Sequence, residues 1–137
     1  TGKPYYESMK QYENDNVKIV PYIDDMPSLM HATDLIISRA GASTLSEITA
    51  LGVPAILIPS PYVASNHQEY NALELVNAGA AKMILEKELQ VDNLIDMMDC
   101  LINDETALNI LKDNAKKLGK PQACQDIYQV IIEMLGE

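Results

Sequence analysis

The sequence predicts an α/β fold in which a short parallel sheet carries helices on its faces. Three apolar runs, at residues 34–38, 54–59 and 81–85, alternate with segments whose apolar residues recur at helical spacing, and glycine and proline separate them. Buried parallel strands occur as short continuous apolar runs, and strands that alternate with helices form parallel sheets. A chain of 137 residues that is 47% apolar is long enough for one domain with a core.

Several elements are expected around the first apolar run. Residues 4–12 should form an exposed helix, residues 17–22 a first strand and residues 27–31 a short helix. The run at residues 34–38 is then the second strand, and a helix should follow over residues 44–51.

The second half of the chain begins with a strand over residues 54–59, followed by a helix over residues 66–78 and a fourth strand over residues 81–85. From residue 91 the pattern is helical to the end, with breaks at residues 103–104 and 119–121. Six apolar side chains of these last helices are expected in the core: Met97, Met98, Leu101, Ile131, Met134 and Leu135.

Charge and cysteine content exclude several classes of function. Twenty acidic residues against ten basic ones give a net charge of −10, which repels nucleic acid and anionic lipid. Cys100 and Cys124 lack metal-ligand spacing, so no metal site is expected and both thiols should be reduced, as in a cytosolic protein. No apolar run approaches about 18 residues, so no membrane-spanning segment is predicted.

The most informative motif covers residues 38–47, which follow an apolar run and open a helix. The start of a helix has up to four unpaired N–H groups and about +0.5 of a charge, so small residues there let an anion approach closely. Arg39 is the one arginine of the chain, and its fixed fork of donors suits a diphosphate. Glu47 is either a capping-box acid or an acceptor for two ribose hydroxyls.

Three segments rich in polar or small residues are expected at the carboxyl ends of strands: residues 22–26, 39–47 and 59–71. Open parallel sheets bind their ligands at that edge. The sequence therefore predicts a ligand site where these segments meet.

Taken together, these motifs resemble the C-terminal, donor-binding part of the MurG family of bacterial N-acetylglucosamine transferases. The resemblance is carried by residues 22–26, 38–47, 51–55, 66–72 and 78–81. It is strong to about residue 85 and weak over the closing helices. The order of the motifs is specific, whereas each one alone is shared with other GT-B glycosyltransferases.

The resemblance implies the C-terminal domain of a GT-B enzyme, with an incomplete Rossmann-like sheet that lacks its first βα unit. Residues 1–137 would form a partial UDP-sugar-binding domain, with a βα core over residues 1–85 and C-terminal helices over residues 86–137. Family members place the proposed general base in a separate acceptor domain. The chain alone is therefore expected to be inactive, no catalytic residue is assigned in it, and His67 is expected to be structural.

By resemblance, the uracil is recognised through the main chain of one loop residue, the ribose hydroxyls by a glutamate, and the sugar hydroxyls by two side-chain amides on one helix face. Backbone N–H groups and a hydroxyl surround the sugar and the diphosphate. The ten residues implied, in chain order, are Ile23, Arg39, Ala42, Ser43, Thr44, Leu45, Ser46, Glu47, Gln68 and Asn71.

Each role has a structural alternative. Ile23 could be a buried loop residue, and Arg39 could pair with a nearby acid. Residues 42–45 could form an ordinary Ser/Thr helix cap, while Gln68 and Asn71 could lie on a solvated polar face.

The implied reaction transfers N-acetylglucosamine, with inversion, from UDP-N-acetylglucosamine to undecaprenyl-diphosphoryl-N-acetylmuramoyl-pentapeptide during peptidoglycan synthesis. The lipid-linked acceptor would bind the missing N-terminal domain and would place the enzyme at the inner face of the bacterial cytoplasmic membrane. No cofactor or nucleic acid is implied. Two alternatives stay open, namely the donor subunit of another UDP-sugar transferase and a non-catalytic nucleotide-sugar-binding module. A sheet edge exposed by the missing strand offers a route to dimerisation.

Overall fold

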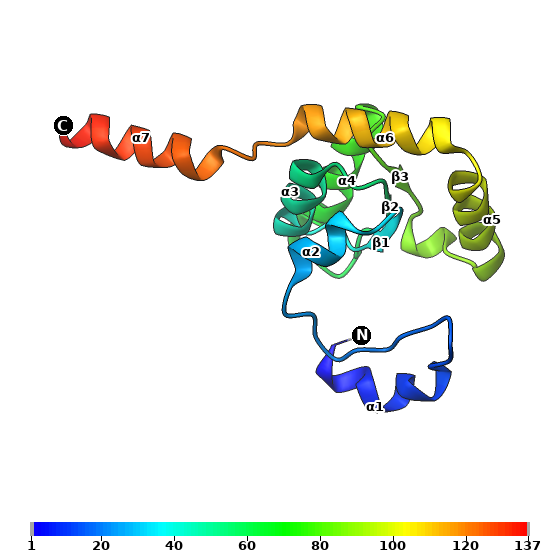
Figure 1. Ribbon diagram of the computed structural model, residues 1–137. Coiled ribbons are helices and arrows are strands. Elements are labelled where there is room, and N and C mark those ends of the chain that lie inside the picture. Colours follow the sequence, from blue (N-terminus) through cyan, green and yellow to red (C-terminus); the bar gives the residue numbers. More distant parts are fainter. Residues whose placement is uncertain (1, 137) are drawn as a thin grey trace.

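A three-stranded parallel sheet lies at the centre of the computed structural model, which describes residues 2–136 (Figure 1). Its strands are β1 (Ile36–Ser38), β2 (Ala55–Leu57) and β3 (Lys82–Met83), in the order β1-β2-β3. Ile37 lies opposite Ile56, and Leu57 lies opposite Met83. These strands fall within the three apolar runs, so the predicted α/β class and the parallel sheet are confirmed.

Helices cover both faces of the sheet. α3 (Ala42–Leu51) links β1 to β2, and α4 (His67–Asn77) links β2 to β3. Side chains alternate along a strand, so Ala55 and Leu57 pack in one cluster with residues of α3 and α4, while Ile56 packs in a second cluster with Leu101 and Leu111. These two leucines belong to α5 (Val91–Ile102) and α6 (Glu105–Leu118).

α6 closes the edge of the sheet at which the strands begin. α3 ends at Gly52, whose φ is 68°, and a Cβ there would lie 2.5 Å from Lys116 Cγ of α6. α4 is followed by Gly79, whose backbone oxygen accepts a hydrogen bond from Asn114 Nδ2 at 3.1 Å. Glycine permits both the positive φ and the close approach at Gly52. The carboxyl ends of the strands consequently lie on the side away from α6.

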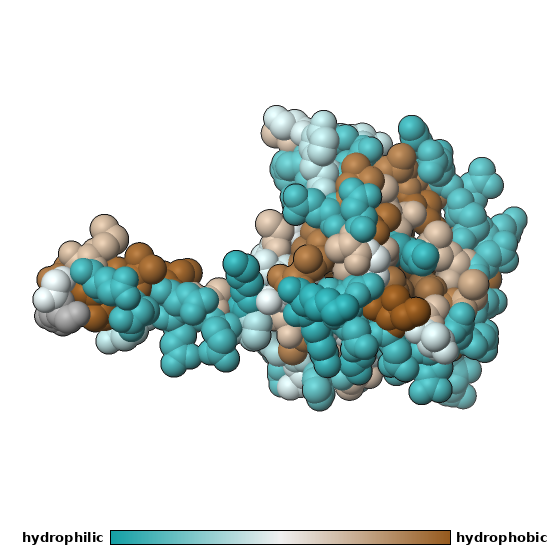
Figure 2. Space-filling view, turned by 90° about the horizontal axis from the view of Figure 1, so that it is seen from above, coloured by the Kyte–Doolittle hydropathy of each residue, from teal (hydrophilic) through white to brown (hydrophobic). Residues whose placement is uncertain are grey.

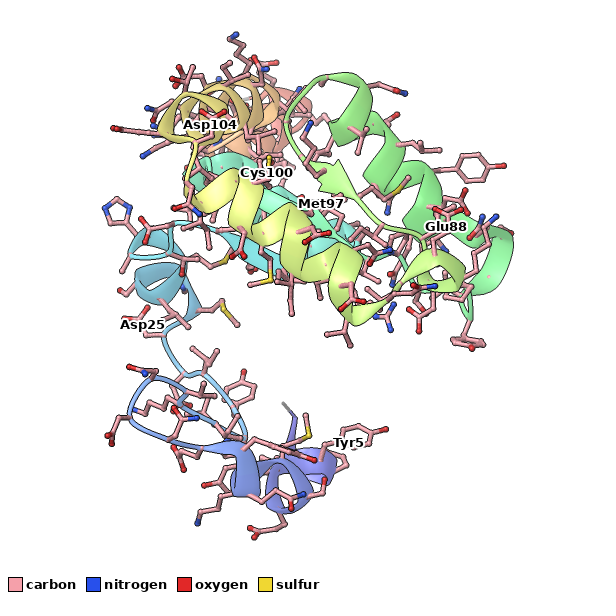
Figure 3. The ribbon with its side chains drawn as sticks, turned by 90° about the vertical axis from the view of Figure 1, so that its right-hand side faces the viewer. Tyr5, Asp25, Glu88, Met97, Cys100 and Asp104 are labelled. Atoms are coloured by element: carbon pink, nitrogen blue, oxygen red, sulfur yellow. The ribbon has the colours of Figure 1, made fainter. Side chains whose placement is uncertain are left out.

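The N-terminal segment contains η1 (Lys3–Tyr5), α1 (Tyr6–Met9) and η2 (Lys10–Tyr12), followed by a loop and α2 (Met26–His31). The short helices match the predicted exposed helix, and α2 matches the helix predicted over residues 27–31. The predicted strand over residues 17–22 is wrong: Val17 forms only an isolated antiparallel bridge with Asn14. A strand needs a neighbour for its backbone groups, and this segment lies apart from the sheet (Figures 1 and 3).

The C-terminal helices begin and end where the sequence predicts, with breaks after α5 and α6. Met97, Met98 and Leu101 of α5 pack around Ile56, as expected. The other three core assignments are wrong, because α7 (Ala123–Leu135) projects from the body of the protein (Figures 1 and 2). Helical spacing identifies an apolar face but not what covers it. The misassigned residues of α7 are exposed: Ile131, Met134 and Leu135.

Cys100 and Cys124 are exposed free thiols. Among residues 2–136, no helix has the length and apolar character needed to cross a membrane.

Candidate functional site

Residues from the carboxyl ends of all three strands meet around Arg39. Arg39 directly follows β1, Ile58 directly follows β2, and Glu86 lies three residues after β3, at the start of η4 (Glu86–Glu88). Arg39 Nη1 donates a hydrogen bond to the backbone oxygen of Ile58 at 3.1 Å and also pairs with the carboxylate of Glu86. The structural alternative for Arg39, a pair with a nearby acid, is therefore present, and the acid comes from the far edge of the sheet.

The ion pair changes the acid–base properties of both side chains. The hydrogen bond from Arg39 lowers the pKa of Glu86, and the same bond raises the pKa of Arg39. Both groups are consequently charged at neutral pH, and a guanidinium cation lies at the expected ligand edge.

The start of α3 presents backbone donors at that edge. Gly41 is the N-cap and makes no side-chain capping bond, and the first hydrogen bond of the helix runs from Leu45 N–H to Gly41 O at 3.0 Å. In the part of the chain that the structure describes, no acceptor pairs with the N–H groups of Ala42, Ser43 or Thr44. The Ser/Thr cap considered for these residues is wrong. Of the four predicted backbone donors, those of Ala42, Ser43 and Thr44 are unpaired, whereas the N–H of Leu45 is already bonded to Gly41 O.

Gly41 leaves space in front of these donors. Its φ is −69°, which any residue adopts, and a Cβ built on it would meet no atom within 4 Å. Neither backbone conformation nor packing explains a glycine here, so the gap suits a molecule that approaches the backbone closely.

Glu47 is an exposed side chain on α3. Because the helix begins at Ala42, two residues earlier than predicted, Glu47 is its sixth residue and lies beyond the capping-box position. Within residues 2–136 its carboxylate makes no hydrogen bond or ion pair, so the capping role is wrong and the carboxylate is available to a ligand.

Gln68 and Asn71 of α4 bind the loop between β1 and α3. The Gln68 side-chain oxygen accepts hydrogen bonds from Ala40 N–H at 3.3 Å and Ser60 N–H at 2.9 Å, while Asn71 Nδ2 donates to Ala40 O at 3.3 Å. Both amides are half-buried, so the solvated-face alternative is wrong. His67 Nδ1 lies 2.7 Å from Ala64 O in the turn before α4, which fits a structural role.

The Arg39 partner Glu86 is a residue that sequence reasoning missed. It lies in a stretch of three charged side chains, residues 86–88, which is typical of a solvated turn, although its position just beyond an apolar strand places it at the ligand edge. The Ser60 N–H that orients Gln68 was also missed, because a backbone contact has no signal in the sequence.

The structure does not connect Ile23 to the rest of the predicted group. It lies half-buried in the loop before α2, and it does not follow a strand as expected. No hydrogen bond within residues 2–136 joins it to the residues around Arg39.

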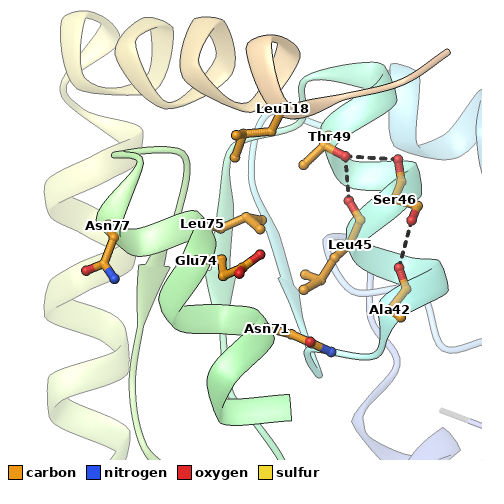
Figure 4. A pocket seen from close by; sticks show the side chains of 9 residues that line it. All are labelled: Ala42, Leu45, Ser46, Thr49, Asn71, Glu74, Leu75, Asn77 and Leu118. Atoms are coloured by element: carbon orange, nitrogen blue, oxygen red, sulfur yellow. Dashed lines mark hydrogen bonds between the residues drawn. The ribbon is translucent and has the colours of Figure 1, made fainter. Parts of the chain in front are cut away.

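A groove of about 600 Å³ runs between α3 and α4 (Figure 4). Ala42 and Asn71 lie at one end of it and Leu118 of α6 lies near the other. Of the predicted site residues, Ala42, Leu45, Ser46 and Asn71 line it. The Ser46 hydroxyl donates to Ala42 O at 2.9 Å and so lies along the helix rather than toward Arg39.

Comparison with known proteins identifies relatives of the chain. Residues 1–127 match the glycosyltransferase family 28 C-terminal domain. An enzyme of Caldicellulosiruptor saccharolyticus is 51% identical over 121 residues, which is 88% of this chain and 33% of that protein. An enzyme of Listeria monocytogenes serotype 4a is 44% identical over 98% of this chain and 39% of its own length. Both are named UDP-N-acetylglucosamine–N-acetylmuramyl-(pentapeptide) pyrophosphoryl-undecaprenol N-acetylglucosamine transferase.

Solved structures agree with this relationship. MurG of Acinetobacter baumannii superposes with a TM-score of 0.85 over 96% of this chain and 39% of its own, at 28% identity. The glycosyltransferase VinC, solved in complex with dTDP, superposes with a TM-score of 0.67 at 21% identity over 90% of this chain and 32% of its own, which shows the shared fold. The chain spans between a third and two fifths of the length of these relatives. It belongs to the family of glycosyltransferase family 28 C-terminal domains.

Proposed function

We propose that this chain is the donor-binding half of a transferase that moves N-acetylglucosamine from UDP-N-acetylglucosamine to undecaprenyl-diphosphoryl-N-acetylmuramoyl-pentapeptide. The names of the relatives from C. saccharolyticus and L. monocytogenes support the donor and the acceptor. The observation that carries the proposal is that the unpaired N–H groups of Ala42, Ser43 and Thr44 lie at the same edge of the sheet as the guanidinium of Arg39. Both kinds of donor bind phosphate oxygens.

The chemical contribution of this half is to stabilise the leaving group. As the acceptor hydroxyl attacks the anomeric carbon and inverts it, the bond to UDP breaks and negative charge grows on the diphosphate. Oriented backbone donors and a fixed cation act most strongly where such charge develops, because they need no reorganisation during the reaction. The general base would come from the acceptor domain, and no residue of this chain is assigned that role.

The remaining donor contacts follow from the hydrogen bonds that the side chains already make. The oxygen of Gln68 is engaged by two backbone N–H groups, so Gln68 offers its amide N–H groups to a sugar oxygen. Asn71 uses Nδ2 on Ala40 O, so it offers its oxygen to a sugar hydroxyl. Glu47 would accept the ribose hydroxyls, and the main chain of Ile23 would recognise uracil.

The wider organisation is part of the same proposal. Residues 1–85 form the βα core of the UDP-sugar-binding domain and residues 86–137 its closing helices. The lipid-linked acceptor places the complete enzyme at the inner face of the cytoplasmic membrane. The outer edge of β1 has no strand neighbour within residues 2–136, and a second copy of the chain could pair there.

The direct test is a transfer assay on the full-length protein with UDP-N-acetylglucosamine and the lipid-linked acceptor. UDP release that requires both substrates, together with the glycosylated lipid product, is expected. Binding of UDP-N-acetylglucosamine without transfer would instead support a non-catalytic binding module. Transfer from a different UDP-sugar would support the donor subunit of another transferase.

A further inference from the structure

Arg39 and Glu86 connect opposite edges of the sheet. Arg39 follows β1 and Glu86 follows β3, and 47 residues separate them in the sequence. The backbone oxygen of Ile58, at the end of the central strand, accepts a hydrogen bond from the same Arg39 nitrogen at 3.1 Å. The guanidinium therefore lies across the carboxyl ends of all three strands.

The hydrogen bond to Ile58 O and the pair with Glu86 use only one side of the Arg39 guanidinium. Nη1 carries two N–H groups, and its two acceptors are Ile58 O and the carboxylate of Glu86. Within residues 2–136, neither Nη2 nor Nε makes a hydrogen bond. The Arg39 side chain is 50% exposed, so this second edge of the fork is accessible. An arginine binds two oxygens of a phosphate or carboxylate through such an edge.

Glu86 is well placed to hold Arg39 without blocking it. It lies in a short turn, η4, that begins three residues after β3, and its side chain is 30% exposed. Pro59, Pro61 and Leu85 line a cavity of about 360 Å³ together with Glu86.

We propose that Glu86 is a positioning residue, which holds Nη1 of Arg39 so that the opposite edge of the guanidinium receives the diphosphate of the nucleotide sugar. This inference rests on the proposed function, because it assigns a partner to the arginine of that site. Arg39 itself contacts the ligand, whereas Glu86 acts through Arg39.

A positioning role predicts that removing the Glu86 carboxylate weakens diphosphate binding, whereas electrostatic repulsion alone predicts that it strengthens diphosphate binding. A carboxylate near a diphosphate repels it, so losing the charge should strengthen diphosphate binding if position did not matter. A competitor role, in which Glu86 occupies Arg39 until the ligand displaces it, also predicts stronger binding. A positioning role predicts weaker UDP binding with uridine binding unchanged, whereas a purely structural role predicts that both weaken.

The test compares Glu86→Gln with Glu88→Gln in the full-length protein. Glu88 lies in the same short helix and carries the same charge, but it lies 3.9 Å from Lys87 and does not contact Arg39. Calorimetric titrations with UDP and with uridine distinguish a loss of diphosphate binding from a loss of nucleoside binding. We expect Glu86→Gln to raise the Kd for UDP by about fivefold, or about 1 kcal/mol, with uridine binding unchanged. Glu88→Gln should leave both unchanged.

A second comparison shows whether Glu86 acts through Arg39. In an Arg39→Gln background, Glu86→Gln should cause no further loss of UDP affinity, because the group that it positions is gone. Unchanged or stronger UDP binding by the Glu86→Gln variant would overturn the inference, and so would an equal loss of uridine binding, which indicates a structural role. A wild-type protein that binds neither ligand would instead overturn the proposed function and this inference with it.

Discussion

The side-chain oxygen of Gln68 accepts a hydrogen bond from the backbone N–H of Ala40, 28 residues earlier in the chain, at 3.3 Å. The same oxygen accepts Ser60 N–H, and Asn71 donates to Ala40 O, so both backbone groups of the buried Ala40 are bound by α4. Ala40 lies two residues before the first residue of α3. The start of α4 therefore fixes the loop that presents the donors of α3.

Two substitutions of Gln68 separate its structural role from its ligand role. Gln68→Ala leaves two part-buried N–H groups without an acceptor and should lower the free energy of unfolding by about 1–3 kcal/mol. Gln68→Glu keeps the oxygen and loses the amide donor, so stability should change little while affinity for UDP-N-acetylglucosamine falls. Urea unfolding and calorimetric titration measure the two effects. Equal destabilisation by both variants would contradict this assignment.

Glu47 offers a cleaner test of donor binding. Its side chain is exposed and its carboxylate makes no hydrogen bond or ion pair within residues 2–136, so Glu47→Ala should leave the unfolding free energy within about 0.5 kcal/mol. Loss of hydrogen bonds to the ribose, each about 1.5–3 kcal/mol when desolvated, should raise the Kd for UDP at least tenfold. Asp96→Ala, at an exposed acid of α5, is the control for charge. An unchanged UDP affinity in Glu47→Ala would remove Glu47 from the site.

The parts of the fold that could be predicted are those with a local cause. The apolar runs around Ile37, Ile56 and Met83 identify the strands, because each run is short, continuous and set between segments of helical spacing. Gly52 identifies the end of α3, because its positive φ favours glycine. The position of residues 39–41 between a strand end and a helix start can be predicted too, because a strand followed by small residues and a helix start is a contiguous pattern. Their contact with a ligand stays a prediction.

The parts that could not be predicted depend on partners far away in the sequence. Val17 lies in an apolar run, yet within residues 2–136 its only strand-like pairing is the isolated bridge to Asn14. Met134 lies on an apolar helix face, but α7 does not return to the core. Glu86 carries no motif, and only the convergence of β1 and β3 brings it to Arg39. A periodic pattern shows that a face is apolar or a strand is extended, whereas tertiary contacts decide what it meets.

Gly41 gives a prediction in which stability and binding change in opposite directions. It is the N-cap of α3 in an extended conformation, with open space at the Cβ position. Gly41→Ser should add a side-chain capping bond and stabilise the protein by a few tenths of a kcal/mol. The new side chain would occupy the space in front of Ala42 and Ser43 N–H, so UDP should bind more weakly. Thermal unfolding and UDP titration would show this, and a variant with tighter UDP binding would contradict it.

Leu101 and Met134 test the corrected assignment of the core. Leu101 is 3% exposed and packs beside Ile56, so Leu101→Ala should lower the free energy of unfolding by about 2–4 kcal/mol. Met134 is 82% exposed on α7, so Met134→Ala should change the free energy of unfolding by less than about 0.5 kcal/mol. Urea unfolding of the two variants measures the difference. A similar loss in both would mean that α7 packs against another part of the protein in solution.

The Arg39–Glu86 pair predicts an acid-dependent loss of stability. Arg39 lowers the pKa of Glu86 below its ordinary value of 4.5. The Glu86 carboxyl therefore binds a proton less readily in the folded state than in the unfolded state. The pair contributes its full stability above the ordinary pKa, and this contribution is lost as the pH falls through the lowered pKa.

Between about pH 6 and about pH 3 the wild type should lose more stability than Glu86→Gln, which has no proton to gain at this position. Asp25, whose pKa is lowered by its capping bond to Ser28, titrates in the same direction in both proteins and cancels in the comparison. Parallel stability profiles for the two proteins would show that the pair does not form in solution.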